Sequence, residues 1–179
     1  MVYIDNSDNL NGDINIEGLE IRNITNFQLG SSFFNIKNSN STLNFESSLF
    51  SENNADTLIN INDIYGKVIL QNLTFFKNNV NSQIVNLLNI YDLFLSDLLS
   101  DQTNNKCEND GGFLRSENIF FRQITNLTVS NSCSSQTTVG VKFIDMDIDL
   151  LMNSFQEIDQ PYVHFNIQNN ILIISFRLK

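Results

Sequence analysis

The sequence predicts an all-β protein folded as a right-handed parallel β-helix, a solenoid whose coils stack through short strands. Three observations lead to this prediction: a strand template that recurs about every 21 to 34 residues, a second strand within each unit, and a composition rich in turn formers. The chain has 179 residues, 41% of them hydrophobic, enough for one core. We therefore expect one β-helix domain over residues 1–179, of about six to seven coils and forming a segment of a longer protein.

The composition favours strands joined by many turns. About one residue in six is asparagine, proline occurs once and tryptophan is absent. Asparagine suits turns because its side chain bonds its own backbone and tolerates positive φ, whereas isoleucine, phenylalanine and valine fit a pleated sheet. Few helix formers remain for a helical bundle.

A short template organises the chain, with apolar residues at its first and third positions, a polar cluster, and a large apolar residue at its eighth. The copies that keep all three positions are Phe27, Leu29, Phe34; Leu43, Phe45, Phe50; Val68, Leu70, Phe75; Ile148, Leu150, Phe155; and Ile171, Ile173, Leu178. Two weaker copies, Leu93 with Leu95 and Leu127 with Val129, carry Ser100 and Ser134 at the eighth position. In two copies an asparagine, Asn53 or Asn78, follows the eighth residue by three, which suits a corner.

A second alternating strand follows most template starts by about 14 to 20 residues. Its inward positions are Ile59, Ile61, Val85, Leu87, Phe113, Val141, Phe143, Val163, Phe165 and Ile167, and its outward positions include Asn60, Asn86, Lys142, His164 and Asn166. A unit of two strands without a helix can bury its apolar side only against the next unit, so the units must stack. One long interval predicts an inserted polar loop at 102–112, and Ile119–Ile124 is expected to add structure of its own.

An antiparallel β-sandwich is the alternative fold. It also gives short strands separated by turns, at intervals of about 8 to 12 residues. It does not, however, require the template to recur in phase along the chain.

The template resembles the parallel β-helix repeat of the pectin-lyase-like superfamily, in which spaced aliphatic residues precede a polar cluster, Phe and then Asn. The segments "LNFESSLFSENN" and "VILQNLTFFKNN" show the resemblance best, and it covers most of residues 27–179. The Asn-rich and Phe-rich sequence is also similar to repeats in very large surface proteins of ciliates and other protists. The superfamily contains polysaccharide lyases and glycoside hydrolases as well as adhesins without catalysis, so the resemblance implies the fold and leaves the activity open.

One acidic cluster is the candidate for chemistry. Asp145, Asp147 and Asp149, with Lys142, would form the site of an enzyme on acidic polysaccharide, and Asp147 with Asp149 could bind Ca²⁺. A solvated acidic edge explains the same residues and is favoured, as is a surface role for the single histidine, His164. The paired-aspartate and His-Gly motifs of polygalacturonases are absent, and we expect no cofactor.

Two further features concern modification. Cys107 and Cys133 lie about one coil apart, so a disulfide between them is as well supported as two free thiols. Sequons for N-glycosylation occur at Asn23, Asn40, Asn72 and Asn126.

The favoured function is that of a non-enzymatic extracellular structural or adhesion element, part of a coat or filament, whose partners are its own copies or neighbouring coils. A net charge of −10 argues against nucleic acid as a partner, and no apolar run is long enough to span a bilayer. Residues 1–10 show no secretory signal. The alternatives are the polysaccharide enzyme and a carbohydrate- or protein-binding module.

Overall fold

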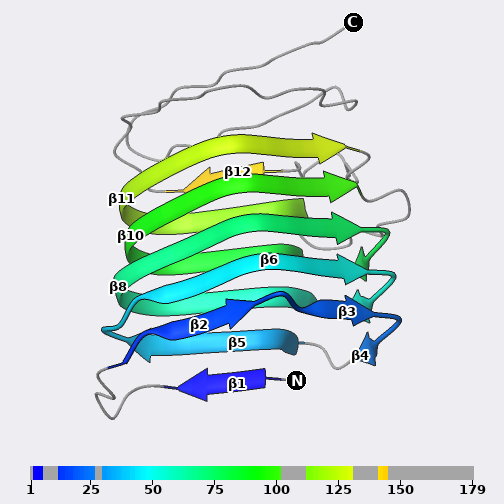
Figure 1. The fold of residues 1–179 in the computed structure, drawn as a ribbon, viewed down its shortest axis with the longest axis horizontal. Helices are drawn as coiled ribbons and strands as arrows, with labels where there is room; N and C mark the ends of the chain where they lie inside the picture. Colours follow the sequence, from blue (N-terminus) through cyan, green and yellow to red (C-terminus); the bar gives the residue numbers. More distant parts are fainter. Residues whose placement is uncertain (1, 6–11, 27–29, 102–111, 131–140, 145–179) are drawn as a thin grey trace, which may run out of the picture.

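The structure is a computed structural model that describes residues 2–5, 12–26, 30–101, 112–130 and 141–144 (Figure 1). Within these ranges the chain forms strands joined by tight corners. The strands are β1 (Val2–Asp5), β2 (Ile14–Glu17), β3 (Glu20–Arg22), β4 (Thr25–Asn26), β5 (Ser32–Ser39), β6 (Leu43–Ser51), β7 (Asn54–Ala55), β8 (Thr57–Phe76), β9 (Asn79–Val80), β10 (Gln83–Asp101), β11 (Gly112–Ser130) and β12 (Val141–Ile144).

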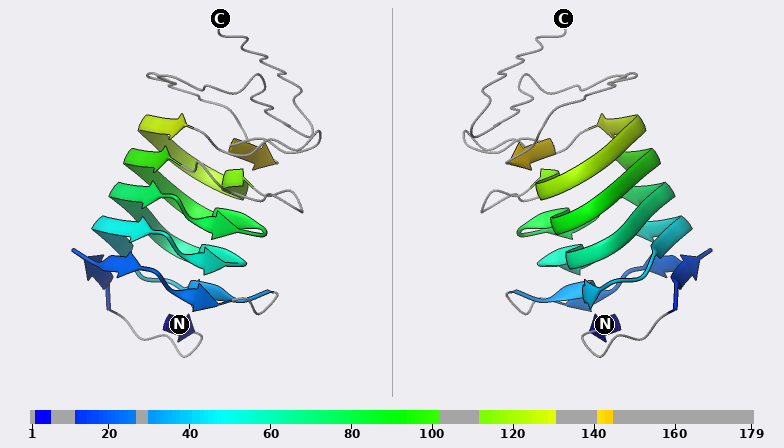
Figure 2. Two further views of the ribbon diagram at one scale, coloured as in Figure 1. Left: turned by 90° about the vertical axis from the view of Figure 1, so that its right-hand side faces the viewer. Right: turned by 90° about the vertical axis from the view of Figure 1, so that its left-hand side faces the viewer.

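The described strands stack in parallel, each on its equivalent in the next coil. The main sheet contains the path β1-β5-β8-β10-β11-β12, with β2, β3 and β6 continuing it around the coil, and a small second sheet contains β4, β7 and β9. Figures 1 and 2 show these layers one above another along a single axis. The predicted parallel β-helix is confirmed, and the antiparallel sandwich is wrong because every described pairing is parallel. The predicted coil number is not tested, since residues 145–179 lie outside the described ranges.

The central copies of the template are in phase. Leu43 pairs with Val68, and Val68 pairs with Leu93, so the first template positions form one inward ladder. The predicted inward residues of the second strand, Ile59, Ile61, Val85, Leu87 and Phe113, are all buried. The two strands of each coil therefore enclose one shared core.

The first predicted copy is wrong at Phe34, and its other two positions, Phe27 and Leu29, lie outside the described residues. Phe34 lies in β5 and pairs with Ile59, so it belongs to the second strand of its coil. The template positions of that layer are instead Ile14, Ile16 and Ile21, which pair with Leu43, Phe45 and Phe50. The error arose because Phe34 has the right spacing and size, whereas the true copy carries isoleucine at its eighth position.

The copy at Leu127 is also misplaced, by five residues. Leu127 pairs with Leu98, and the partners of Leu93 and Leu95 are Arg122 and Ile124. Residues 119–124 are thus part of β11 and not an added element. The coil that contains the predicted loop is 29 residues long by register; residues 102–111 of that loop lie outside the described ranges.

Phenylalanine rings form the centre of the core. The Phe50 and Phe75 rings stack with centroids 5.1 Å apart and planes inclined by 14°. In the next coil Ser100 occupies the equivalent position, and the ring that meets Phe75 is that of Phe113, at 5.4 Å, from the second strand. A large side chain from the facing strand therefore fills the volume that the serine leaves, which explains why the template tolerates Ser100.

Each coil turns at corners where the backbone adopts positive φ. The described non-glycine residues in this conformation fall on three ladders, Asn38, Asp63, Asn89 and Asn118; Ser47, Asn72 and Asp97; and Asn23, Glu52 and Lys77. Asparagine and aspartate predominate because their short polar side chains tolerate the left-handed region. The high asparagine content therefore serves the corners as the composition predicted.

Gly66 occupies an irregular corner where two residues, Tyr65 and Gly66, lie opposite Tyr91 alone. A Cβ atom at Gly66 would lie 2.7 Å from the Asn40 carbonyl oxygen and still closer to that of Ser41. Both obstacles are backbone atoms, which cannot move aside as a flexible side chain would.

We expect Gly66→Ala to lower the free energy of unfolding by about 1–3 kcal/mol because the methyl group forces two coils apart. Gly12→Ala is the matched control: nothing lies within 4 Å of its Cβ position, and its effect should stay within about 0.5 kcal/mol. Urea unfolding followed by circular dichroism measures both. Equal effects of the two substitutions would contradict the close approach at Gly66.

Candidate functional site

The predicted acidic site falls almost wholly outside the described residues. This holds for Asp145, Asp147, Asp149 and His164, and for the predicted disulfide partners Cys107 and Cys133. Lys142 lies in β12, where its backbone pairs with that of Arg115. The polysaccharide site, the Ca²⁺ site and the disulfide therefore remain predictions.

The sequons can be placed more fully. Asn23, Asn40 and Asn72 are exposed on three different corners of the coil. Asn126 lies in β11, at a position where only the backbone is described. The asparagine of every sequon with a described side chain is therefore accessible to solvent.

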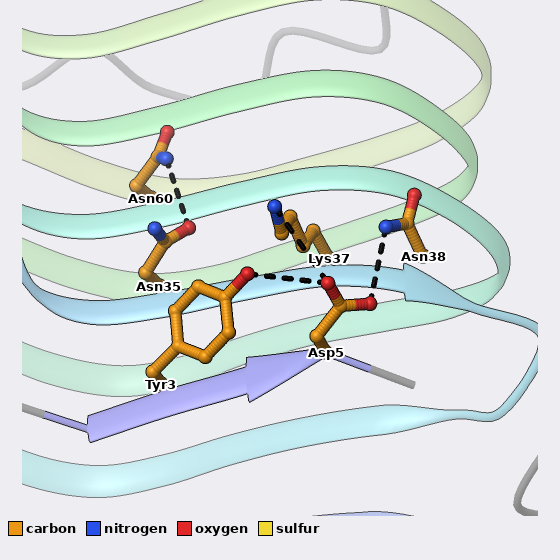
Figure 3. A network of polar contacts seen from close by, with 6 residues as sticks. All are labelled: Tyr3, Asp5, Asn35, Lys37, Asn38 and Asn60. Carbon is orange, nitrogen blue, oxygen red and sulfur yellow. Dashed lines mark hydrogen bonds and ion pairs between the residues drawn. The ribbon is translucent and has the colours of Figure 1, made fainter. Parts of the chain in front are cut away.

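An outward amide ladder crosses the face formed by β5, β8 and β10. Asn60 donates a hydrogen bond from Nδ2 to Asn35 Oδ1 at 3.2 Å, and Asn86 donates likewise to Asn60 Oδ1 at 2.8 Å (Figure 3 shows the first of these). The predicted outward orientation of Asn60 and Asn86 is confirmed. The next register position holds Arg115, whose Nη2 donates to Glu117 Oε2 at 2.6 Å.

A second ladder runs along the corner that follows this face. Asn89 Nδ2 donates to Asp63 Oδ1 at 2.7 Å, and Asn118 Nδ2 donates to Asn89 Oδ1 at 2.9 Å. Each amide has two N–H donors and an acceptor oxygen, so one ladder bond leaves hydrogen-bonding capacity for water or a ligand. The corner thus offers a repeating row of polar groups.

An aromatic stripe, defined as Tyr65, Tyr91 and Phe120, lies two residues beyond this ladder. The three side chains are 68%, 51% and 68% exposed, and the Tyr91 and Phe120 rings stack with centroids 5.4 Å apart. Sequence reasoning missed this stripe. The signal is a repeated tripeptide of Asp or Asn, Ile and an aromatic residue, which occurs at 63–65, 89–91 and 118–120.

A buried asparagine ladder occupies the inside of another corner. Asn78 Nδ2 donates to the Phe50 carbonyl at 2.9 Å, while Asn53 Nδ2 donates to Asn78 Oδ1 at 2.9 Å. Asn53 Nδ2 also donates to the Ile21 carbonyl at 2.9 Å, and both asparagines are fully buried. The prediction that these residues close a corner is confirmed, and they do so from within the core.

Asp56 is a buried carboxylate that links three coils. Its Oδ2 accepts a hydrogen bond from the Gly30 amide at 3.0 Å, and its Oδ1 accepts one from Ser82 Oγ at 3.3 Å. Gly30 and Ser82 belong to the coils on either side. Asp56 therefore acts as a structural acceptor between layers.

A polar network fastens β1 to β5 at one end of the described stack (Figure 3). Asp5 Oδ2 accepts a hydrogen bond from the Tyr3 hydroxyl and lies 3.7 Å from Lys37 Nζ, while Asp5 Oδ1 accepts one from Asn38 Nδ2 at 3.1 Å. A hydrogen bond and charge interaction with Tyr3, followed by the charge of Asp5, raise the pKa of Lys37 above 10.5.

We expect Asp5→Asn to loosen β1 without unfolding the stack. The ion pair with Lys37 is partly exposed to solvent, so its loss should change the stability of the whole stack little. Hydrogen exchange should show faster exchange of the β1 amides and unchanged protection in β8 and β10. Glu20→Gln, which breaks an exposed ion pair elsewhere, is the control and should leave β1 unchanged. Unaltered hydrogen exchange of the β1 amides in Asp5→Asn would contradict the role of Asp5 in fastening β1 to β5.

Two kinds of feature are absent from the described part of the chain. Among the described residues, no three His, Cys, Asp or Glu side chains gather as metal ligands would. No helix in the described ranges has the length and apolar character needed to cross a membrane. The amide ladders and the aromatic stripe are features of the described surface that repeat from coil to coil.

Comparison with known proteins adds no identification beyond this geometry. No family model, no curated protein and no solved structure matches the chain.

Proposed function

We propose that this chain is a structural or adhesion element, a β-helical rod that forms part of a coat or filament outside the cell. The observation that supports the proposal is continuity along the axis. Inward apolar ladders, the buried Asn53–Asn78 pair and the outward Asn35–Asn60–Asn86 ladder all join one coil to the next. A rod built in this way resists separation of its layers through many small contacts, which suits a structural role.

The finer assignment is to the repeats of the pectin-lyase-like superfamily, similar to those of large ciliate surface proteins. The described corners support this assignment, because the asparagines of the Phe-x-x-Asn motifs lie inside the coil beside stacked phenylalanines. The extracellular location is supported by the exposure of Asn23, Asn40 and Asn72, where glycans could be attached without disturbing the core.

The proposed partner is another β-coil, from the same or a neighbouring chain. Among the described strands, β1 pairs with β5 alone, and β2 pairs with β6 alone. A strand edge left open in this way pairs readily with another strand. Assembly through such edges would continue the rod in register.

A binding module is the second candidate, favoured by the aromatic stripe beside the Asp63–Asn89–Asn118 ladder. Exposed rings next to amide groups suit a ligand with both apolar and polar faces, such as a carbohydrate. A glycan array with the wild-type chain and a Tyr91→Ser variant tests it. Binding that depends on Tyr91, without cleavage of the glycan, would favour this candidate over the rod.

Electron microscopy of the native material, with antibody labelling of the chain, tests the proposed rod. The expected result is labelled, elongated density that continues along a filament or coat. The control is antibody pre-adsorbed with the purified chain, which should give no labelling. A discrete particle with a closed end and an acidic cleft would contradict the proposal. That result would direct attention to cleavage of acidic polysaccharides and to Asp145, Asp147 and Asp149.

A further inference from the structure

The sequon Asn40-Ser41-Thr42 lies at the corner between β5 and β6, and the Asn40 side chain is exposed. Ser39 pairs with Ile64, and Leu43 pairs with Val68, so each strand has three residues between these pairs. Asn40 therefore occupies the register position of Tyr65 in the adjacent layer.

The two layers approach closely at this corner. The Cβ position of Gly66 is 2.7 Å from the Asn40 carbonyl oxygen, so no side chain separates the two backbones there. Neighbouring strands of a sheet lie about 4.8 Å apart, which is within the reach of one sugar ring. Tyr65, which is 68% exposed, is therefore the register neighbour of Asn40 at a corner where the two backbones approach closely.

We propose that Asn40 carries an N-linked glycan whose first sugar packs against the ring of Tyr65. In the transfer, Asn40 Nδ2 bonds to the anomeric carbon of a lipid-pyrophosphate-linked oligosaccharide and gives up a proton. The bond between that carbon and the pyrophosphate oxygen breaks, and the lipid pyrophosphate leaves. The attached sugar covers apolar ring surface that the fold leaves in water.

The other described sequons lack such a neighbour. The register neighbours of Asn72 are Ser47 and Asp97, and Asn72 Nδ2 donates to Ser47 Oγ at 3.4 Å. The register neighbour of Asn23 is Glu52. Among the three sequons with described side chains, the aromatic platform is therefore specific to Asn40.

The inference rests on the extracellular part of the proposed function, because glycan transfer takes place in the secretory pathway. The test uses the full chain secreted from a eukaryotic host behind an added signal peptide, with its glycans trimmed to one N-acetylglucosamine. Mass spectrometry of the Asn40 peptide gives the occupancy. Proton NMR then gives the chemical shifts of the attached sugar.

Two variants separate packing from simple attachment. The sugar protons should show upfield ring-current shifts in the wild-type chain that disappear in Tyr65→Ser and persist in Tyr91→Ser, the matched control from the next layer. The loss of melting temperature caused by Tyr65→Ser should also be larger in the glycosylated chain than in an Asn40→Gln background. Both tyrosines are exposed, so neither variant removes core packing.

The outcomes distinguish this inference from the proposed function. The inference is overturned if Asn40 is not glycosylated in the host. It is also overturned if Asn40 is glycosylated but the chemical shifts of its sugar protons are the same in the wild-type chain and in Tyr65→Ser. Either result leaves the proposed rod intact. A modified Asn40 in the host combined with an unmodified one in the native material overturns the extracellular location on which both depend.

Discussion

Replacement of Phe75 by alanine is expected to lower the free energy of unfolding by about 3–5 kcal/mol. Phe75 is fully buried, stacks on Phe50 and meets the edge of Phe113, so its removal opens a cavity shared by three coils. Ser100, the register neighbour in the next coil, is too small to fill that cavity. Equilibrium unfolding in urea or guanidinium, monitored by circular dichroism, measures the change.

Phe76→Ala is the matched control, because it makes the same substitution one residue later on the outward face. The Phe76 ring is 36% exposed and lies 4.8 Å from Lys77 Nζ, so its loss should cost under about 1 kcal/mol. Similar losses for the two variants would mean that β8 does not alternate inward and outward at this point.

Asn78→Ala should be the second severe substitution. The side chain accepts two hydrogen bonds from Asn53 and donates one to the Phe50 carbonyl, all inside the core. Removal leaves buried backbone and amide groups without these bonds, at a cost of about 1–3 kcal/mol for each group that finds no other partner. We expect a total loss of about 2–5 kcal/mol in the same unfolding experiment.

Asn60→Ala provides the control for the buried ladder. Asn60 lies in an equivalent coil-to-coil amide ladder, but on the outer face where water can replace its bonds to Asn35 and Asn86. Its loss should therefore be under about 1 kcal/mol. An effect as large as that of Asn78→Ala would show that position inside or outside the coil is not what governs the strength of these ladders.

The sequence predicted those parts of the fold in which adjacent coils have the same length. From Leu43 to Leu93 the register advances by 25 residues per coil, so equivalent side chains recur in phase and the template is visible. On either side, pairs such as Ile14 with Leu43 and Leu93 with Arg122 are 29 residues apart. The additional residues of these coils shift the phase of the template, and a fixed spacing then selects Phe34 or Leu127 in error.

Contacts between facing strands of a coil could not be predicted from linear sequence patterns. Phe113 meets Phe75 from the facing strand, and a template read along one strand cannot show which facing residue fills a gap. The outward asparagines were predicted because strand alternation alone assigns their side. The aromatic stripe was missed because its rings face water, whereas the pattern search sought apolar residues for the core.

The candidate site was predicted only in part for a related reason. The sequons at Asn23, Asn40 and Asn72 are local motifs, so the sequence identifies them, but only the register shows that Asn40 lies beside Tyr65. The acidic cluster from Asp145 to Asp149 remains a prediction because it lies outside the described residues.

Cross-strand nuclear Overhauser effects report directly on the parallel stacking of the coils. We expect contacts from the Leu70 backbone to Phe45 on one side and to Leu95 on the other, each 25 residues away in parallel register. Strong contacts between Hα atoms of facing residues, which characterise the closely spaced pairs of antiparallel strands, would contradict it.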